Sequence, residues 1–161
     1  MKKIEKNLYL KNNFNILLIM IFKYIAGNKY NHAINTSKKI MNINKNNIPV
    51  INYAIENNKK IDMKIYKEYE NLSNNLDENY RIALKLSSFN FDENILNDII
   101  DIYSSKNIKI LIDAEDNSLY NNYNNTINKL ITDYNHTNCN IYKTYQMYRK
   151  DSLSELLNDI N

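Results

Sequence analysis

The feature that most constrains this chain is the alternation of short apolar runs with longer segments of helical periodicity. Apolar runs at 81–87, 108–112 and 140–145 are each followed by a segment whose apolar residues recur every three or four positions, as on one face of a helix. Another run, at 50–55, precedes them. Continuous apolar strands joined by helix-length connections pair in parallel, because a parallel crossover needs a dozen or more residues. The pattern therefore predicts an α/β fold with four βα units.

The bounds of the expected elements follow from this periodicity and from capping residues. Strands are predicted at 50–55, 81–87, 108–112 and 140–145, and helices at 13–24, 30–41, 62–76, 92–104, 119–134 and 152–159. Gly27 is expected to cap the end of the first helix, and Asn28 and Asp92 the starts of two others. The segment 1–48 is thus a helical lead-in, and 49–161 carries the βα units. We expect one domain, since a chain of this length buries roughly 70% of its unfolded surface.

Periodicity leaves two architectures open. Four βα units suit either a small open sheet or half of an eight-stranded (βα)8 barrel. In both, chemistry is usually placed where parallel strands end. Polar residues stand at these ends: Glu56, Lys85, Asp113 and Gln146.

Composition argues against several classes of protein. The net charge is +3, from 21 basic and 18 acidic residues that are scattered along the chain, so no nucleic-acid partner is expected. Asparagine makes up about a fifth of the chain, which we attribute to an A/T-rich genome and not to a prion-like tract. The apolar run 16–22 is too short for a transmembrane segment and is predicted to lie in a buried helix.

The single cysteine, Cys139, excludes an internal disulfide framework and favours a reducing compartment. His136 and Cys139 have the spacing of two metal ligands, but a second pair is missing, so no metal site is expected. The amino terminus is rich in Lys and free of Arg, which favours the cytoplasm over mitochondria.

Four stretches, in order and at similar spacing, resemble the first half of the proline dehydrogenase family. They are FKYIAGNKYNHAINTSKKIMNINKNNIPVINYAIEN (22–57), IALKLSSF (82–89), LIDAED (111–116) and IYKTYQMYRKD (141–151). The resemblance implies a (βα)8 barrel that binds FAD and oxidises proline to pyrroline-5-carboxylate by removing a hydride from the carbon next to the ring nitrogen. The chain would supply the first four strands of such a barrel.

The resemblance also implies roles for individual residues. Lys85 matches a lysine that holds the proline carboxylate, and an ammonium in an apolar strand needs such an anionic partner; the alternative is an edge-strand lysine. Asp113 matches an aspartate beneath the flavin, although it could instead cap the next helix, as could Asp116. Gln146 matches a glutamine that contacts the flavin ring, unless it is only a satisfied interior amide. Second-tier candidates, supported by position, are Glu56, Glu115, Thr144 and Tyr148.

The chain departs from the family in lacking the later strands and the final helix that bears a tyrosine and two arginines for the substrate. It could be one half of a split enzyme, it could pair with a homodimer mate or a second chain that covers the open edges, or it could be a decayed remnant. The other functional reading is a non-catalytic α/β module that acts in binding or interaction.

Overall fold

The computed structural model describes residues 26–27, 29–53 and 63–160, in two compact units, Met1–Asn47 and Ile48–Asn161. The described part of the first unit is dominated by helix α2 (Tyr30–Ile43), whose buried residues are Ile34 and Ser37. Its N-cap is Lys29 and not the predicted Asn28, whose placement lies outside the described residues. The helix predicted at 13–24 lies outside them too, so the capping role expected of Gly27, which has a φ of +104°, stays a prediction.

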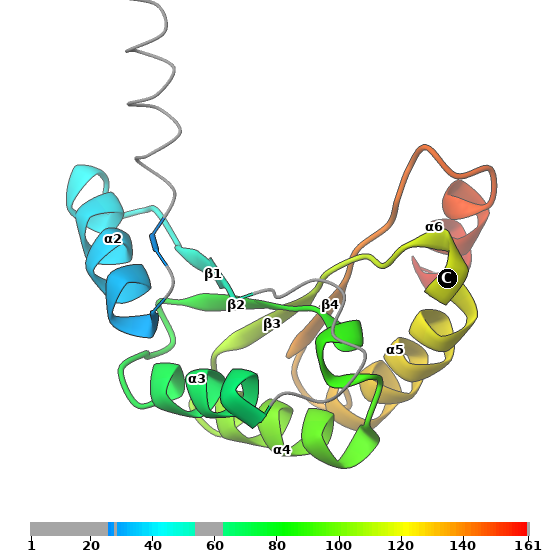
Figure 1. The fold of residues 1–161 in the computed structure, drawn as a ribbon. Coiled ribbons are helices and arrows are strands. Elements are labelled where there is room, and N and C mark those ends of the chain that lie inside the picture. The colour runs from blue at the N-terminus through cyan, green and yellow to red at the C-terminus, as the bar shows by residue number, and fades with distance from the viewer. Residues whose placement is uncertain (1–25, 28, 54–62, 161) are drawn as a thin grey trace, which may run out of the picture. The chain divides into compact units, whose positions relative to one another are not determined.

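The second unit is built on a four-stranded parallel sheet (Figure 1). Its strands follow the chain in the order β1 (Val50–Asn52), β2 (Arg81–Leu84), β3 (Lys109–Ile112) and β4 (Ile141–Lys143). Ile51, Ile82, Ile110 and Ile141 form one row across the sheet. The predicted α/β class and the parallel order are therefore confirmed, as in a fragment of a TIM-like barrel.

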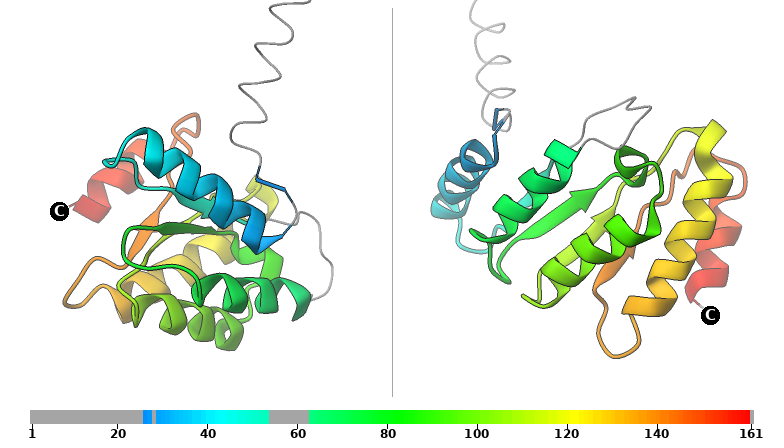
Figure 2. Two further views of the ribbon diagram at one scale, coloured as in Figure 1. Left: turned by 90° about the vertical axis from the view of Figure 1, so that its left-hand side faces the viewer. Right: turned by 60° about the horizontal axis from the view of Figure 1, so that its bottom comes forward.

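A helix follows each strand, and the helices after β1, β2 and β3 cover one face of the sheet. In chain order, the helices that follow the strands are α3 (Met63–Ser73), α4 (Glu93–Ser104), α5 (Tyr120–Tyr134) and α6 (Ser152–Ile160). Figure 2 shows α3, α4 and α5 side by side on that face. None of the helices in the described residues is long and apolar enough to cross a bilayer; the run 16–22 lies outside these residues.

The two faces of the sheet differ sharply in burial. Side chains directed at the helices are almost inaccessible: Ile82, Leu84, Ile110 and Ile112 are each 0% exposed. Alternate residues on the other face, among them Ala83 and Leu111, are only half-buried, and Tyr142 is 45% exposed. This second face, which we call the open face, would line the interior if the sheet continued into a barrel.

Two strands end earlier than the sequence predicts, for identifiable reasons. β2 stops at Leu84 because the 3-10 turn η1 (Leu86–Phe89) begins immediately afterwards, with the Ser88 amide donating to the Lys85 carbonyl at 3.1 Å. β4 stops at Lys143, and the Thr144 hydroxyl instead donates to the Ile112 carbonyl at 2.7 Å. β1 is described only to Asn52 and Tyr53, because 54–62 lie outside the described residues.

The capping prediction for α4 is confirmed, whereas the capping candidates for α5 are wrong. Asp92 caps α4 as expected, accepting hydrogen bonds from the Asn94 and Ile95 amides, each at 3.1 Å. Asp116 precedes a short 3-10 turn, η2 (Asn117–Leu119), and its side chain makes no capping bond. The residue before α5 is Leu119, so neither Asp113 nor Asp116 serves as its N-cap.

Buried tyrosines join the helices to the carboxyl ends of the strands. The Tyr69 hydroxyl of α3 donates to the Ala83 carbonyl of β2, and it lies 3.1 Å from this oxygen and from the Tyr53 carbonyl oxygen. The Tyr123 hydroxyl of α5 donates to the Thr144 carbonyl at 3.2 Å. These bonds satisfy polar groups in an otherwise apolar layer and fix the end of the sheet at which the candidate residues lie.

Candidate functional site

Lys85 and Asp113 lie next to each other at the carboxyl ends of β2 and β3. The sheet register pairs Leu84 with Ile112, and the Asp113 amide donates to the Leu84 carbonyl at 2.9 Å, so the ladder extends to this level. Since side chains alternate along a strand and residues 84 and 112 face the helices, Lys85 and Asp113 follow the open face. The structure thus brings these two candidates together on one face and at one end of the sheet.

Glu115 is the best-anchored carboxylate at this end of the sheet. Its side chain is buried, and its two oxygens accept hydrogen bonds from the amide and the hydroxyl of Ser87, each at 2.8 Å. Burial raises the pKa of Glu115, while the two Ser87 bonds and the positive charge of Lys85 oppose this shift and the negative charge of Asp113 adds to it. Lys85, Asp113 and Glu115 therefore form one electrostatic group.

Gln146 joins this group from the segment that follows β4. The Gln146 Nε2 donates to the Glu115 backbone carbonyl at 3.2 Å, and the Gln146 backbone carbonyl accepts from the Ser152 hydroxyl at 2.7 Å. Thr144 lies on the same segment, attached to the Ile112 carbonyl. The ends of β2, β3 and β4 are thus connected by side-chain bonds that pass through Glu115.

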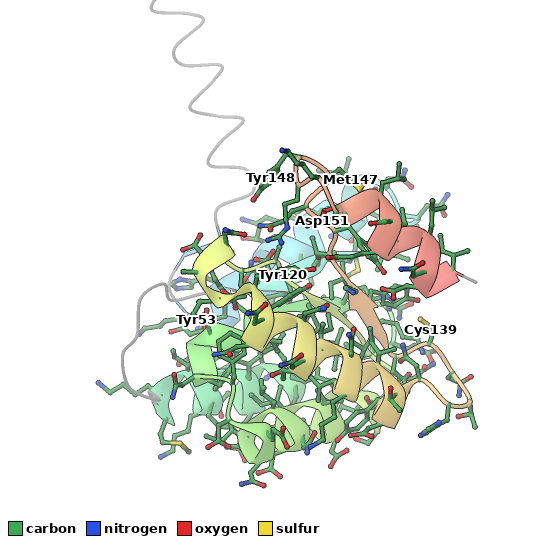
Figure 3. The ribbon with its side chains drawn as sticks, turned by 90° about the vertical axis from the view of Figure 1, so that its right-hand side faces the viewer. Tyr53, Tyr120, Cys139, Met147, Tyr148 and Asp151 are labelled. Atoms are coloured by element: carbon green, nitrogen blue, oxygen red, sulfur yellow. The ribbon has the colours of Figure 1, made fainter. Side chains whose placement is uncertain are left out.

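Tyr148 is placed differently from the other candidates. Its side chain is 83% exposed and, with Met147, lies in the loop between β4 and α6 (Figure 3). The next residue, Arg149, stacks on the Tyr120 ring with its guanidinium carbon 3.6 Å from the ring centroid, and it donates to the Asn117 side chain at 2.9 Å. The structure therefore does not bring Tyr148 into the group around Glu115. The last candidate, Glu56, lies outside the described residues.

The crevice between α5 and the segment after β4 is too small for an organic ligand. Glu115, Tyr123, Gln146 and Arg149 are among the residues that line it, and its volume of about 10 Å³ is about the least that can hold one water molecule. At this end of the sheet, the open face is the alternative surface for a larger molecule, and Lys85 and Asp113 continue there from Ala83 and Leu111. Within the described part of the chain, no three His, Cys, Asp or Glu side chains are grouped as metal ligands.

The donor set of the open face is chemically compatible with a flavin ring. Ala83 and Leu111 are half-buried neighbours in the sheet register and offer an apolar surface to a planar ring. Lys85 and Asp113 add a cation and an anion at the strand ends, and the Gln146 amide, in the segment after β4, is a group that can both donate and accept hydrogen bonds.

Ser87 is the residue of this group that the sequence did not single out, because it was assigned to the end of a strand. A signal was present. Ser87 and Glu115 each follow a strand-end candidate, Lys85 or Asp113, by two residues, so strands in register would bring them to the same level.

The family model described as proline dehydrogenase matches residues 9–161. No curated protein matches the chain significantly.

Proposed function

The chain belongs to the proline dehydrogenase family, and on this premise we propose that its second unit forms part of a flavin-dependent site for proline oxidation. The observation that supports this most is the juxtaposition of Lys85 and Asp113 on the open face, at the carboxyl ends of adjacent parallel strands. In barrels of parallel strands, this end of the sheet carries the chemistry.

Each candidate residue then has a role that suits its chemistry. Lys85 holds the proline carboxylate through a charge-assisted hydrogen bond, and Asp113 lies under the flavin ring and orients the cationic groups around the substrate. Gln146 contacts the ring edge through its amide. When bound, FAD supplies the acceptor for the hydride that leaves the carbon beside the proline nitrogen. The protein contributes position and charge.

We further propose that a second polypeptide, or a second copy of this chain, completes the site. β1 and β4 are the outer strands of the described sheet and each has one neighbour, so each offers an edge to which a further strand could pair. In the group formed by Lys85, Asp113, Glu115 and Gln146, Lys85 is the cation, and a lysine cannot bind a carboxylate with the two-point geometry of a guanidinium. The nearby Arg149 stacks on Tyr120 and donates to Asn117. The reducing compartment that Cys139 suggests, with the cytoplasm favoured, belongs to the same proposal.

Two measurements test this function. After FAD is added and the unbound cofactor is removed, the purified chain should retain the visible absorption of bound oxidised flavin, and so should Lys85→Met. Proline-dependent dye reduction should be undetectable with the chain alone, because turnover falls steeply when the substrate is not positioned. It should appear when a polypeptide carrying the remaining strands and the arginine-bearing helix is added.

In the complemented enzyme, Lys85→Met should lower kcat/KM by roughly 10- to 100-fold, the effect of losing a charge-assisted hydrogen bond. The matched control is Lys109→Met, because Lys109 lies at the opposite end of β3 and donates to the Asn107 and Asn140 side chains at 2.9 and 3.1 Å. Absence of flavin absorption would favour the non-catalytic binding module. Strong dye reduction by the chain alone would contradict the need for a second polypeptide.

A further inference from the structure

Glu115 occupies an unusual position in the part of the chain that the structure describes. It is 4% exposed, and the other buried polar side chains there, apart from tyrosines, are serines. A buried carboxylate is stable only when its oxygens are hydrogen-bonded. Ser87 donates to both of these oxygens, through its amide and its hydroxyl.

The Ser87 bonds connect segments that are 28 residues apart in sequence. Below them, the Asp113 amide donates to the Leu84 carbonyl at 2.9 Å. Along the strands, Lys85 and Asp113 therefore lie between this backbone hydrogen bond and the side-chain hydrogen bonds of the Ser87–Glu115 pair. The Ser87–Glu115 bonds lie beyond Leu84 and Ile112, the last residue pair of the β2–β3 ladder.

Glu115 also reaches the third strand end. Its backbone carbonyl accepts from the Gln146 Nε2 at 3.2 Å. Glu115 is thus bonded to the segment after β2 through its side chain and to the Gln146 amide through its backbone carbonyl.

We propose that Glu115, through Ser87, is a positioning residue that fixes Lys85, Asp113 and Gln146 relative to one another and that touches neither flavin nor substrate. The ligands in this inference rest on the proposed function, but the positioning itself does not. A residue with a merely structural role would affect folding and leave the folded protein's affinity for flavin unchanged.

The first test uses Ser87→Ala, Glu115→Ala and the conservative Ser87→Thr, with Glu93→Ala as the control. Glu93 is a half-exposed carboxylate on α4 that pairs with Lys129. Ser87→Ala and Glu115→Ala should weaken FAD binding, measured by quenching of flavin fluorescence, on the order of 10-fold. Ser87→Thr and Glu93→Ala should stay within about twofold of the unmodified chain.

The second test needs no flavin and is made by NMR on the free chain. The ε-methylene signal of Lys85 should shift in a step as Glu115 titrates, and the step should shrink in Ser87→Ala, where Glu115 remains but loses its hydroxyl partner. Ser87→Thr should restore it.

The inference is overturned if Ser87→Ala keeps the unmodified chain's Lys85 step, or if FAD affinity falls only in proportion to the loss of folded protein. A chain that binds no flavin would refute the proposed cofactor. The step in the Lys85 NMR signal would still test whether Glu115 is a positioning residue.

Discussion

Hydrogen bonds from single tyrosine hydroxyl groups join helices to the strand ends near the candidate site. Tyr69 is 1% exposed, burial raises its pKa, and its hydroxyl reaches backbone oxygens at the ends of β1 and β2. We expect Tyr69→Phe to lower the free energy of unfolding by about 1–3 kcal/mol, because it removes the hydroxyl that donates to a half-buried backbone carbonyl at the strand ends. Denaturant titration followed by circular dichroism measures this.

Tyr66→Phe on the same helix is the matched control, since the Tyr66 side chain is only half-buried. Its effect should stay within about 0.5 kcal/mol. Equal losses in the two variants would show that the Tyr69 hydroxyl contributes no more to stability than the Tyr66 hydroxyl.

At the scale of elements, α6 is attached to β4 by one charged cluster. Asp159 accepts from Lys143, whose side chain is 6% exposed, at 2.9 Å, and from the Tyr145 hydroxyl. Burial by itself would raise the pKa of Asp159, but the bonds from Tyr145 and Lys143 and the charge of Lys143 outweigh it and lower this pKa below 3.8. The carboxylate therefore stabilises the fold above about pH 4, and this contribution is lost as the pH falls further.

Asp159→Asn should thus be less stable than the unmodified chain at pH 7, by no more than about 1 kcal/mol because the Asp159 side chain is 43% exposed and solvent screens the pair. The difference between the two unfolding free energies should shrink as the pH falls below 4 and the Asp159 carboxylate becomes protonated. Glu93→Gln, which breaks the exposed pair with Lys129, serves as the comparison and should change stability less. A difference that stays constant from pH 7 to pH 3 would rule out the ionic contribution.

On the scale of the whole molecule, the second unit contains a core of its own. Its buried apolar residues run from Ile51 to Ile141 and fill the layer between the sheet and its helices. We predict that residues 48–161 alone unfold in one cooperative transition, because burial of this layer provides the main favourable free energy of folding. Thermal unfolding followed by circular dichroism and by tyrosine fluorescence should give coincident curves; a broad or probe-dependent transition would show that residues 1–47 are needed.

Local sequence was sufficient to predict the order and type of the elements. Strand runs such as 108–112 and the helical spacing of Ile95, Ile99 and Ile102 reflect two different periods of side-chain burial, and these periods are visible without coordinates. Parallel pairing followed from the length of the connections. The Asp92 cap was predictable as well, because a capping residue acts within its own helix turn.

The tertiary structure decided where strands end and which side chains meet. β2 stops at Leu84 because η1 turns the chain, and this turn brings the Ser87 amide to Glu115, 28 residues away. Likewise, Gln146 reaches Glu115 only because β4 lies beside β3. Such bonds depend on register between distant segments, and no local pattern records that register. The sequence therefore identified Lys85 and Asp113 by position, whereas the hydrogen bonds between Ser87 and Glu115 depend on the register of two strands and became visible only in the tertiary structure.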